Sequence, residues 1–518
     1  MNSPSMSRRA LLLGGLGLAG MGGLAACTRS SAGTSAGGAT GMDAGPTIGP
    51  VPSASPAAGQ RLVTASLTPK PTTLDLGGVS VDTWAYGDAA PGQVIRATAG
   101  DFLRVTVDNR LPADTTVHWH GIRVRNAADG VPGVTQDPIA PGARYTYEFT
   151  APDPGTYFFH PHVGVQLDRG LYAPIIIDDP NEPGGYDAEW IVVLDDWIDG
   201  TGTTPDEVLA KLVADNGSAG MGGMDHGSMG MGSSGMGSDA TATDGMSGMG
   251  MGTGPSPWGD SGDVTYPHYL VNGKTSADPP TFTAEPGHKA RIRFINAASD
   301  TIFTVALGGH RMTITHTDGH PVQPTDVGAF YIGMGERYDV LVTLSDGVFP
   351  LVAQAFSKSG QAMALVRTSG GDAPAPGATP AELSGPVFTG SQLLPGDGSL
   401  LPQASPERTL DLVLNGSMQG YQWGINGAPY GKNEPLIATA GRRTRINVSN
   451  MTMMSHPLHL HGPAFALADS GLRKDTLLLA PMESRQLDLD PAAGDWMVHC
   501  HNIYHAEVGM MILLKASV

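Results

Sequence analysis

The sequence is poor in cysteine. Its 518 residues contain two, Cys27 and Cys500. If Cys27 takes a lipid, Cys500 has no partner for an intramolecular disulfide, and a lone thiol in an oxidising compartment is a liability unless something binds it. The cysteine count therefore favours a ligand role for Cys500.

Positive charge is also scarce. Lys and Arg total 30 against 49 Asp and Glu, so the net charge is −19, and charged residues make up only 15% of the chain. A nucleic-acid partner needs a basic face, so this composition excludes one. The acidic balance is compatible with a cationic substrate, and plain solubility explains it as well.

Long uncharged apolar runs are missing apart from residues 10–26, which follow Arg8-Arg9. The arginine pair is similar to a twin-arginine export signal, and Leu24-Ala25-Ala26-Cys27 resembles a bacterial lipoprotein cleavage site. A single spanning helix is the alternative, but the run contains six Gly and is short for a membrane span. We expect residues 1–27 to direct export to the periplasm or cell envelope. A lipid on Cys27 would anchor the protein to the membrane, with residues 28–59 as a flexible tether.

Three copies of one pattern divide the rest of the chain. Gly100, Gly287 and Gly441 are each followed by Arg four residues later and by Asn nine residues later, with polar and apolar residues alternating between them. This is a turn followed by a half-buried strand, and three copies imply three related β domains. We place small antiparallel β-sandwiches at residues 60–182, 183–372 and 405–518, with residues 373–404, rich in Pro, Gly and Ala, as a linker.

A second pattern ends domains 1 and 3. Gly155 and Gly494 are each followed five residues later by His, in His160-Pro161-His162 and His499-Cys500-His501. This duplication places Pro161 where domain 3 has Cys500, and Gln166 and Leu171 where it has His505 and Met510. Domain 2 has no such His pair, so we expect it to be a metal-free spacer.

Ten of the 16 His fall in four short clusters, each with one His-x-His pair. The clusters are His118-Trp119-His120, His160-Pro161-His162, His456-Pro457-Leu458-His459-Leu460-His461, and His499-Cys500-His501 with His505. Residues i and i+2 of a strand point to the same face, so each pair can offer two imidazoles to one site. Eight imidazoles suit three metal ions better than one, because a single ion takes about four ligands.

Cys500 lies between His499 and His501, so its thiolate points to the opposite strand face. There it can join His456, His505 and Met510. Two His, one thiolate and a weak axial Met form a blue-copper electron-transfer site. The tripeptide is thus predicted to touch two metal centres, with a short covalent path for an electron from the sulfur into both histidines.

These motifs resemble those of the three-domain multicopper oxidases, from about residue 60 to the C-terminus. The resemblance implies an all-β fold of three cupredoxin-like Greek-key β-sandwiches, and four copper ions that couple one-electron oxidation of a substrate to reduction of O2 to water. It implies type 1 copper at His456, Cys500, His505 and Met510, type 2 copper at His118 and His459, and the type 3 pair at His120, His160, His162, His461, His499 and His501. The trinuclear cluster then lies between domains 1 and 3, and we expect a monomer.

Two carboxylates are candidates for supplying protons to O2. Asp129 lies nine residues after His120, where family members have an acid beside the cluster; a turn residue before Gly130 is the alternative. Many bacterial relatives also have a carboxylate directly after the second type 1 His. Here that residue is Ala506, and Glu507 follows it.

Residues 217–254 are a low-complexity segment of Gly, Ser, Asp and eight Met. These are Met221, Met224, Met229, Met231, Met236, Met246, Met249 and Met251. The segment has no apolar periodicity, so we interpret it as a disordered loop of domain 2. Thioether sulfur is a soft ligand that suits Cu(I), so capture of cuprous ions is the functional hypothesis and a neutral linker is the alternative.

Met454, two residues before His456, matches a Met that bacterial cuprous oxidases place beside type 1 copper; core packing is the alternative. Two features depart from those enzymes: Thr452 stands where they have Asp, and their Met-rich insert lies in domain 3. The leading hypothesis is an exported, lipid-tethered oxidase of Cu(I) that serves copper resistance. The second is a laccase-like oxidase of phenols and aromatic amines, and the third a copper-storage protein.

Overall fold

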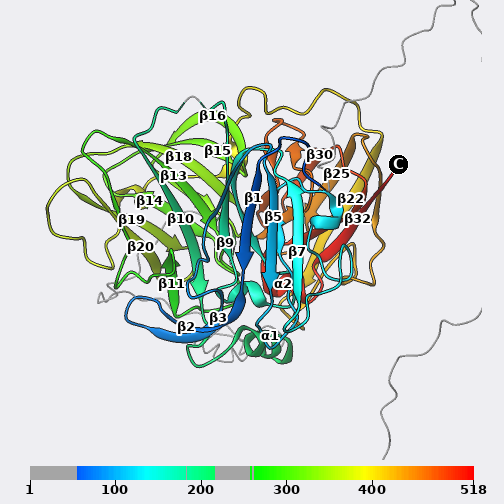
Figure 1. The fold of residues 1–518 in the computed structure, drawn as a ribbon, viewed down its shortest axis with the longest axis horizontal. Helices are drawn as coiled ribbons and strands as arrows, with labels where there is room; N and C mark the ends of the chain where they lie inside the picture. Colours follow the sequence, from blue (N-terminus) through cyan, green and yellow to red (C-terminus); the bar gives the residue numbers. More distant parts are fainter. Residues whose placement is uncertain (1–54, 183, 216–256, 260–261) are drawn as a thin grey trace, which may run out of the picture. The chain divides into compact units, whose positions relative to one another are not determined.

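The computed structural model describes residues 55–518 except 183, 216–256 and 260–261 (Figure 1). The predicted signal, most of the tether and the Met-rich segment 217–254 lie outside the described residues. Strands dominate the described part and helices are few, so the all-β prediction is confirmed. No helix among the described residues is long and apolar enough to cross a membrane.

The described strands group into three successive stretches of chain. In the first, one sheet has the order β1 (Leu62–Leu67), β5 (Phe102–Asp108), β7 (Arg144–Thr150), and another has the order β4 (Ile95–Thr98), β9 (Ala173–Asp178), β8 (Gly155–His160), β6 (His118–His120). The hairpin of β2 (Pro69–Asp75) and β3 (Ser80–Tyr86) completes this stretch.

The second stretch forms two sheets. One has the order β11 (His268–Val271), β10 (Ala188–Trp197), β13 (Lys289–Asn296), β18 (Arg337–Thr343), β15 (Met312–Thr317), β16 (His320–Val327). The other has the order β12 (Thr281–Thr283), β20 (Gln361–Arg367), β19 (Val348–Ala355), β14 (Phe303–Leu307), β17 (Ala329–Ile332), β21 (Val387–Phe388).

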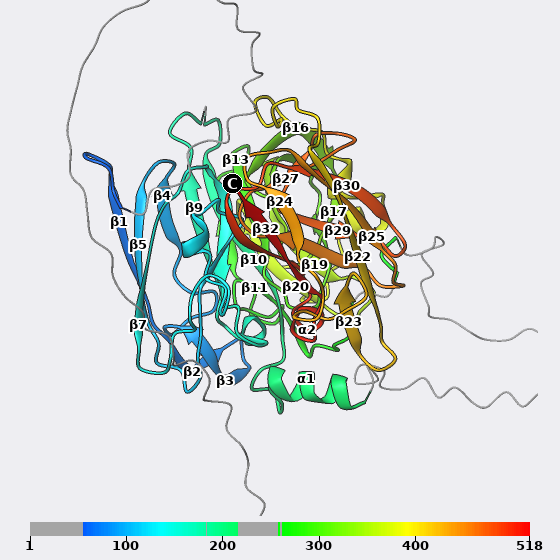
Figure 2. The same cartoon turned by 90° about the vertical axis from the view of Figure 1, so that its right-hand side faces the viewer.

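The third stretch also forms two sheets. One has the order β23 (Gln422–Ile425), β22 (Arg408–Ser417), β25 (Thr444–Asn450), β30 (Ser484–Leu489), β27 (Phe465–Leu467), β28 (Arg473–Lys474). The other has the order β24 (Leu436–Thr439), β32 (Met511–Ser517), β31 (Gly494–Cys500), β26 (His456–Leu460), β29 (Thr476–Leu479). Figure 2 shows β24 beside the C-terminal strand β32.

Helical segments are short in the described chain. They are α1 (Pro205–Ala214), α2 (Ile503–Glu507), and the 3-10 turns η1 (Asn126–Ala128), η2 (Gln166–Asp168), η4 (Ala381–Ser384) and η5 (Gly390–Gln392). Thr204 and Glu207 cap α1 reciprocally, and the Asn502 side chain caps α2 by accepting from the backbone of Tyr504 and His505. The cap on α2 fixes a helix that carries His505.

The predicted linker is not free of the second group of strands. Its residues Val387 and Phe388 form β21, which pairs in parallel with β17, and Pro395 bridges to Val322. A two-residue strand is too short to leave an alternation in the sequence, which is why composition alone suggested a linker.

The repeated turn-and-strand pattern takes one structure at all three places. The three Gly have positive φ, at +94°, +83° and +74°, and the strands that follow are β5, β13 and β25. At the end of each strand Asn109, Asn296 and Asn450 are buried, and each side chain donates to two backbone carbonyls across a loop. Two of these loops lead directly to His118 and His456, so the repeated Asn positions the start of the histidine strands.

Pairing register brings the histidines together. His118 lies opposite His160 in the β6–β8 pair, and His459 lies opposite His499 in the β26–β31 pair. Leu458 lies opposite Cys500, so Cys500 shares a face with His456 and not with His459 or His499. The predicted separation of the Cys500 sulfur from the His499 imidazole is present in β31, and His501 follows the end of that strand.

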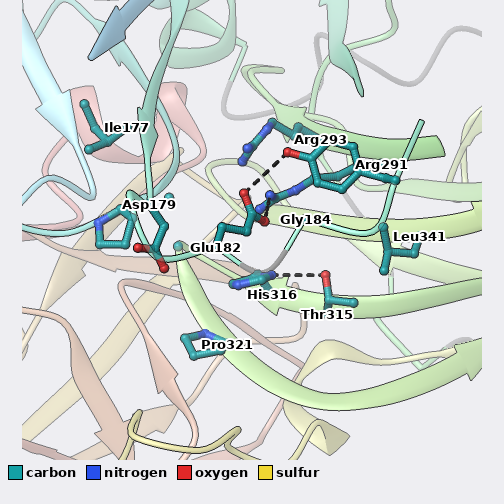
Figure 3. Close-up of a pocket in the computed structure, with 14 residues that line it drawn as sticks. Ile177, Asp179, Glu182, Gly184, Arg291, Arg293, Thr315, His316, Pro321 and Leu341 are labelled. Carbon is teal, nitrogen blue, oxygen red and sulfur yellow. Dashed lines mark hydrogen bonds and ion pairs between the residues drawn. The ribbon is translucent and has the colours of Figure 1, made fainter. Parts of the chain in front are cut away.

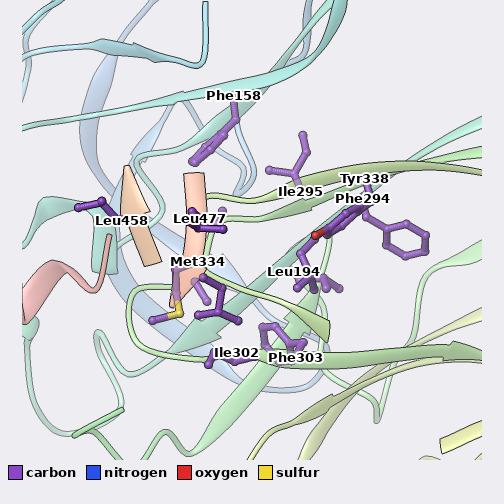
Figure 4. Close-up of a cluster of buried hydrophobic side chains, with 14 of the residues drawn as sticks. Phe158, Leu194, Phe294, Ile295, Ile302, Phe303, Met334, Tyr338, Leu458 and Leu477 are labelled. Carbon is purple, nitrogen blue, oxygen red and sulfur yellow. The ribbon is translucent and has the colours of Figure 1, made fainter. Parts of the chain in front are cut away.

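One hydrophobic core crosses the boundaries between the strand groups. It joins Phe158 of β8 to Phe294 and Tyr338 of the second group and to Leu458 and Leu477 of the third (Figure 4). Burial of this apolar surface holds the groups in contact, which fixes the seam where the histidines meet.

Candidate metal centres

Eight buried or half-buried imidazoles meet where the first and third strand groups contact each other. Their ligand nitrogens fall into overlapping groups within 4.8 Å: His118, His120 and His459; His118, His162 and His461; His120, His160 and His501; His459, His461 and His499. The Nε2 atoms of His118 and His459 are 3.4 Å apart, and those of His461 and His499 are 3.2 Å apart. All eight histidines predicted for the trinuclear cluster are therefore together.

In six of these rings, one nitrogen forms a hydrogen bond with a group outside the histidine cluster. Backbone carbonyls accept from Nδ1 of His118, His459, His160 and His499, at 2.9, 2.9, 3.0 and 2.8 Å. The Asp129 carboxylate accepts from His461 Nδ1 at 2.8 Å, and Thr476 Oγ1 lies 3.1 Å from His120 Nε2. Since a carbonyl can only accept, the proton sits on the outward nitrogen and the lone pair of the other nitrogen faces the seam.

The inward nitrogens fit metal ions. His120 Nδ1, His160 Nε2 and His162 Nε2 are buried without a hydrogen-bond partner. Burial, reinforced by neighbouring imidazoles, lowers the pKa of His160, His162 and His461 well below the usual value, which keeps the rings neutral. Converging neutral imidazole lone pairs are a donor set for a transition metal such as copper or zinc.

A second donor set surrounds Cys500. Its Sγ lies 3.5 Å from His456 Nδ1 and 3.8 Å from His505 Nδ1, and the two Nδ1 atoms are 3.2 Å apart. All three side chains are fully buried. Buried Met510 donates its N–H to the His505 carbonyl and accepts from the Cys500 N–H at 3.0 Å. The four residues predicted for type 1 copper thus lie together, in the Cys–His₂ arrangement of a blue-copper site.

Two acidic residues that no sequence motif predicted form hydrogen bonds with histidines of these donor sets. The Asp475 carbonyl accepts from His459 Nδ1, and its carboxylate Oδ1 lies 3.3 Å from His120 Nε2. Asp263 of the second strand group accepts from His505 Nε2 at 2.8 Å and from the Tyr421 hydroxyl at 2.8 Å. Such partners fix the tautomer of a ligand histidine, and only tertiary contact reveals them here.

The two predicted proton-transfer acids differ in place. Asp129 is fully buried, contacts both His461 and His118, and caps the C-terminal end of η1 before Gly130. Its predicted role in proton supply stays a prediction. Glu507 ends α2 with an exposed side chain, and no hydrogen bond or ion pair connects that side chain to the histidines in the described part of the chain. Met454 lies within the loop that precedes His456, and its side chain is buried in the hydrophobic core.

A separate cleft of about 340 Å³ lies between β9 and the sheet of β13, β15 and β18, and contains no member of either donor set (Figure 3). Its two arginines are already paired: Arg291 with Glu182 and Asp339, and Arg293 with Asp339 at 3.1 Å. The two histidine-rich sets are therefore the stronger candidates for chemistry.

Comparison with known proteins agrees with this geometry. Three family models, each described as multicopper oxidase, match residues 69–182, 242–371 and 403–517. The chain is 45% identical to the multicopper oxidase MmcO of Mycobacterium tuberculosis, over 88% of each chain. It is 29% identical to a copper resistance protein A homolog of Pseudomonas syringae pv. tomato, over 86% of this chain and 90% of the relative.

Among solved structures, Fet3p, a multicopper oxidase that functions in iron import, matches with a TM-score of 0.72 at 19% identity, covering 88% of this chain and 90% of Fet3p. That likeness confirms the cupredoxin-like fold. The chain belongs to the multicopper oxidase family and is a copper-dependent oxidoreductase.

Replacing Cys500 with Ser should remove the intense thiolate-to-copper absorption of the copper-loaded protein, because a hydroxyl is not the soft donor that gives this band. Copper content should fall by about one ion per chain, since the eight-histidine set is untouched. Visible spectra and metal analysis check both results. Cys27→Ser is the matched control and should keep the colour; a coloured Cys500→Ser protein would contradict the assignment.

Gly130 holds Asp129 in place and should not tolerate a side chain. It has φ +81°, and a Cβ would lie 1.8 Å from the Val117 carbonyl oxygen, whereas Gly133, at φ +73°, has open space around its Cβ position. Gly133→Ala should cost only the left-handed backbone penalty of about 1–2 kcal/mol. Gly130→Ala should lower the free energy of unfolding by roughly 3 kcal/mol or more. Urea unfolding of the two variants measures the difference, and equal losses would show that the close approach is unimportant.

Proposed function

We propose that this multicopper oxidase oxidises Cu(I) outside the cytoplasm and passes the electrons to O2, as part of copper resistance. Four Cu(I) ions lose one electron each while one O2 and four protons become two waters. The observation that carries the choice of substrate is a group of exposed methionines beside the loop that leads to the Cys500 site.

The donor groups support four copper ions. His456, Cys500, His505 and Met510 suit type 1 copper, and the facing Nε2 atoms of His118 and His459 suit type 2 copper. The type 3 pair then takes His120, His160 and His501 on one side and His162, His461 and His499 on the other. Bound copper would supply the one-electron oxidation at Cys500 and the reduction of O2 among the eight histidines.

Both imidazoles at the Cys500 site are covered on the side away from the sulfur. His505 Nε2 is bound to Asp263, and His456 Nε2 lies 2.7 Å from Thr452 Oγ1. Asp263 and Thr452 are each 4% exposed. A reductant therefore meets a carboxylate or a hydroxyl before it meets an imidazole, and this arrangement favours a small cation over an aromatic ring that would stack on an exposed histidine edge.

Three methionine side chains are exposed at the surface around the loop that precedes His456. Met451, Met453 and Met482 are 55%, 75% and 56% exposed, although Met is usually buried. The Met482 N–H donates to the Thr452 carbonyl, which brings Met482 to the turn that carries the other two. Thioethers prefer Cu(I), so these residues give a cuprous ion a place to bind at the turn that precedes His456.

The chain that follows the Met-rich segment is attached to the same loop. Ser455 donates to the Trp258 carbonyl at 2.5 Å, and Gly259 bridges to Met454. Trp258 stands four residues after Gly254, where the segment ends. A cuprous ion held by Met221, Met224, Met229, Met231, Met236, Met246, Met249 or Met251 would thus be tethered to the loop before His456.

We further propose that Asp129 supplies protons to the trinuclear cluster. Its carboxylate touches two of the ligand rings, and Oδ1 is buried without a hydrogen-bond partner. Exposed Glu507 is the weaker candidate for this role. Export through residues 1–27, the lipid anchor at Cys27 and a monomeric state belong to the same proposal and rest on the sequence alone.

Oxygen uptake by the copper-loaded protein after addition of Cu(I) tests the proposed substrate. The expected result is uptake of one O2 per four Cu(I), measured with an oxygen electrode, with a sample lacking protein as the control for spontaneous oxidation. Turnover of a phenol in the presence of a copper chelator, with no uptake on Cu(I), would support the laccase-like hypothesis instead. Rapid copper binding with no uptake on either reductant would support storage.

Replacing Met451, Met453 and Met482 with Leu should weaken delivery of Cu(I) but not electron transfer itself. The KM for Cu(I) should rise about tenfold, equivalent to about 1.4 kcal/mol of binding. The kcat for an organic reductant should stay unchanged. Met363→Leu, buried in the second strand group, controls for loss of a thioether as such. An unchanged KM for Cu(I) in the triple variant would remove these methionines from the substrate path.

A further inference from the structure

Asp475 connects two ligand histidines of the proposed trinuclear cluster. Its carbonyl accepts from His459 Nδ1 at 2.9 Å. Its carboxylate accepts from Thr476 Oγ1 at 2.8 Å and lies 3.3 Å from His120 Nε2. Because the Thr476 hydroxyl gives its proton to Asp475, it can only accept from His120 Nε2, 3.1 Å away. The proton of His120 is thus fixed on Nε2, and Nδ1 faces the seam.

Asp129 makes the corresponding contacts to two other histidines of the cluster, His118 and His461. Its carbonyl accepts from His118 Nδ1 and its carboxylate from His461 Nδ1, so His461 presents Nε2. His118 stacks on His461 with ring centroids 3.6 Å apart, and His120 stacks on His459 at 3.7 Å. Asp129 therefore fixes which nitrogen of His461, in the third strand group, faces inward. Asp475 does the same for His120, in the first strand group.

Asp475, unlike Asp129, is held by a cation from the second strand group. Both Asp475 oxygens accept from the Arg337 guanidinium, at 2.6 and 2.5 Å. No Lys or Arg of the described residues pairs with Asp129. Arg337 also donates from Nε to the Thr156 carbonyl at 3.1 Å and from Nη1 to the Gly335 carbonyl at 2.9 Å. Its side chain therefore contacts all three strand groups.

Arg337 is closely surrounded by other residues. It is fully buried, and a Cβ on Gly121 would lie 2.3 Å from its Nη2. A Cβ on Gly335, at φ +83°, would lie 2.9 Å from carbon atoms of both His120 and His501. Two glycines thus allow the loop before β18 to reach the ligand rings closely, and the guanidinium enters beside them.

The charge of Arg337 belongs to a buried ionic group. Lys474 lies 3.0 Å from Asp318 and 3.1 Å from Glu336, and Asp318 accepts from the backbone N–H of Arg337, Asp475 and Thr476. Removal of one partner from a buried ion pair is strongly destabilising, because a charge is left without compensation. These ion pairs and backbone hydrogen bonds therefore hold Asp475 in its position.

We propose that Arg337 is a positioning residue of the trinuclear site: by clamping Asp475 it makes His120 present Nδ1 and His459 present Nε2 to copper. Among the described residues, the second strand group gives no member of the histidine and cysteine donor sets. It thereby fixes which ring nitrogens of the first and third strand groups face the copper. The proposal rests on the proposed copper set but not on the identity of the reductant.

Arg337→Lys tests this role, because Lys keeps the charge but cannot make two parallel hydrogen bonds. Arg443→Lys is the matched control: Arg443 is also buried and pairs through two bonds, at 2.8 and 3.0 Å, with Asp490, away from any ligand. Copper retained against increasing chelator is measured with the type 1 absorption and the type 2 electron paramagnetic resonance signal as separate readouts.

Arg337→Lys should hold the type 2 and type 3 copper about 10–100-fold less tightly than the Arg443→Lys control, with the type 1 absorption unchanged. Equal retention in both variants would overturn the proposal. Parallel loss of type 1 and type 2 signals would also overturn it, because it would show a general effect on folding. The wild-type signals establish the copper set itself, so a failure of Cu(I) oxidation does not affect the outcome.

Thr476→Val provides a second test that leaves every buried charge in place. It removes the hydroxyl that accepts from His120 Nε2 while keeping the side-chain volume, so the protein should fold even if Arg337→Lys does not. The expected result is the same selective weakening of type 2 and type 3 copper, with the type 1 absorption unchanged. Wild-type retention of all copper in this variant would contradict the proposed control of His120.

Discussion

A buried imidazole N–H needs an acceptor, and this requirement governs the seam between the first and third strand groups. A buried donor without a partner costs about 1–3 kcal/mol, so eight rings cannot be packed together unless most outward nitrogens are satisfied. Carbonyls next to the histidines in sequence or in the neighbouring loop accept from four rings, and Asp129 and the Thr476–Asp475 pair accept from two more. The lone pairs that remain can only point inward.

The second strand group contributes more than spacing. Asp263 binds a histidine of the Cys500 site, and Arg337 reaches the eight-histidine site through Asp475. In the same strand group, fully buried Asp300 accepts from the Asp263 backbone and from Lys358, and also from the side chain of Asn502, which caps α2. A spacer without metal ligands is compatible with the described residues, but its buried charges orient the ligands of its neighbours.

The ligand histidines could be predicted from sequence because strand alternation is a local rule. Residues two apart in a strand point to the same face. The same rule places His456 and Cys500 on the face opposite to His459 and His499. The repeated Asn109, Asn296 and Asn450 were visible as a pattern, although their loop-bridging role was not. Asp263, Arg337 and Asp475 were missed because each is a single residue whose partner lies far away in sequence, so no spacing marks it. The strand β21 was missed because two residues carry no periodicity.

Complete burial of Cys500, His456 and His505 also affects how metal reaches the protein. A copper ion cannot arrive at the sulfur through solvent while the native packing is intact, so insertion and loss both require a transient opening of the chain around it. The half-life of copper exchange is then set by the rate of local unfolding around Cys500 rather than by the coordination bonds. A chain that folds before copper is supplied would acquire its colour slowly, and a loaded chain would surrender that ion slowly to its surroundings.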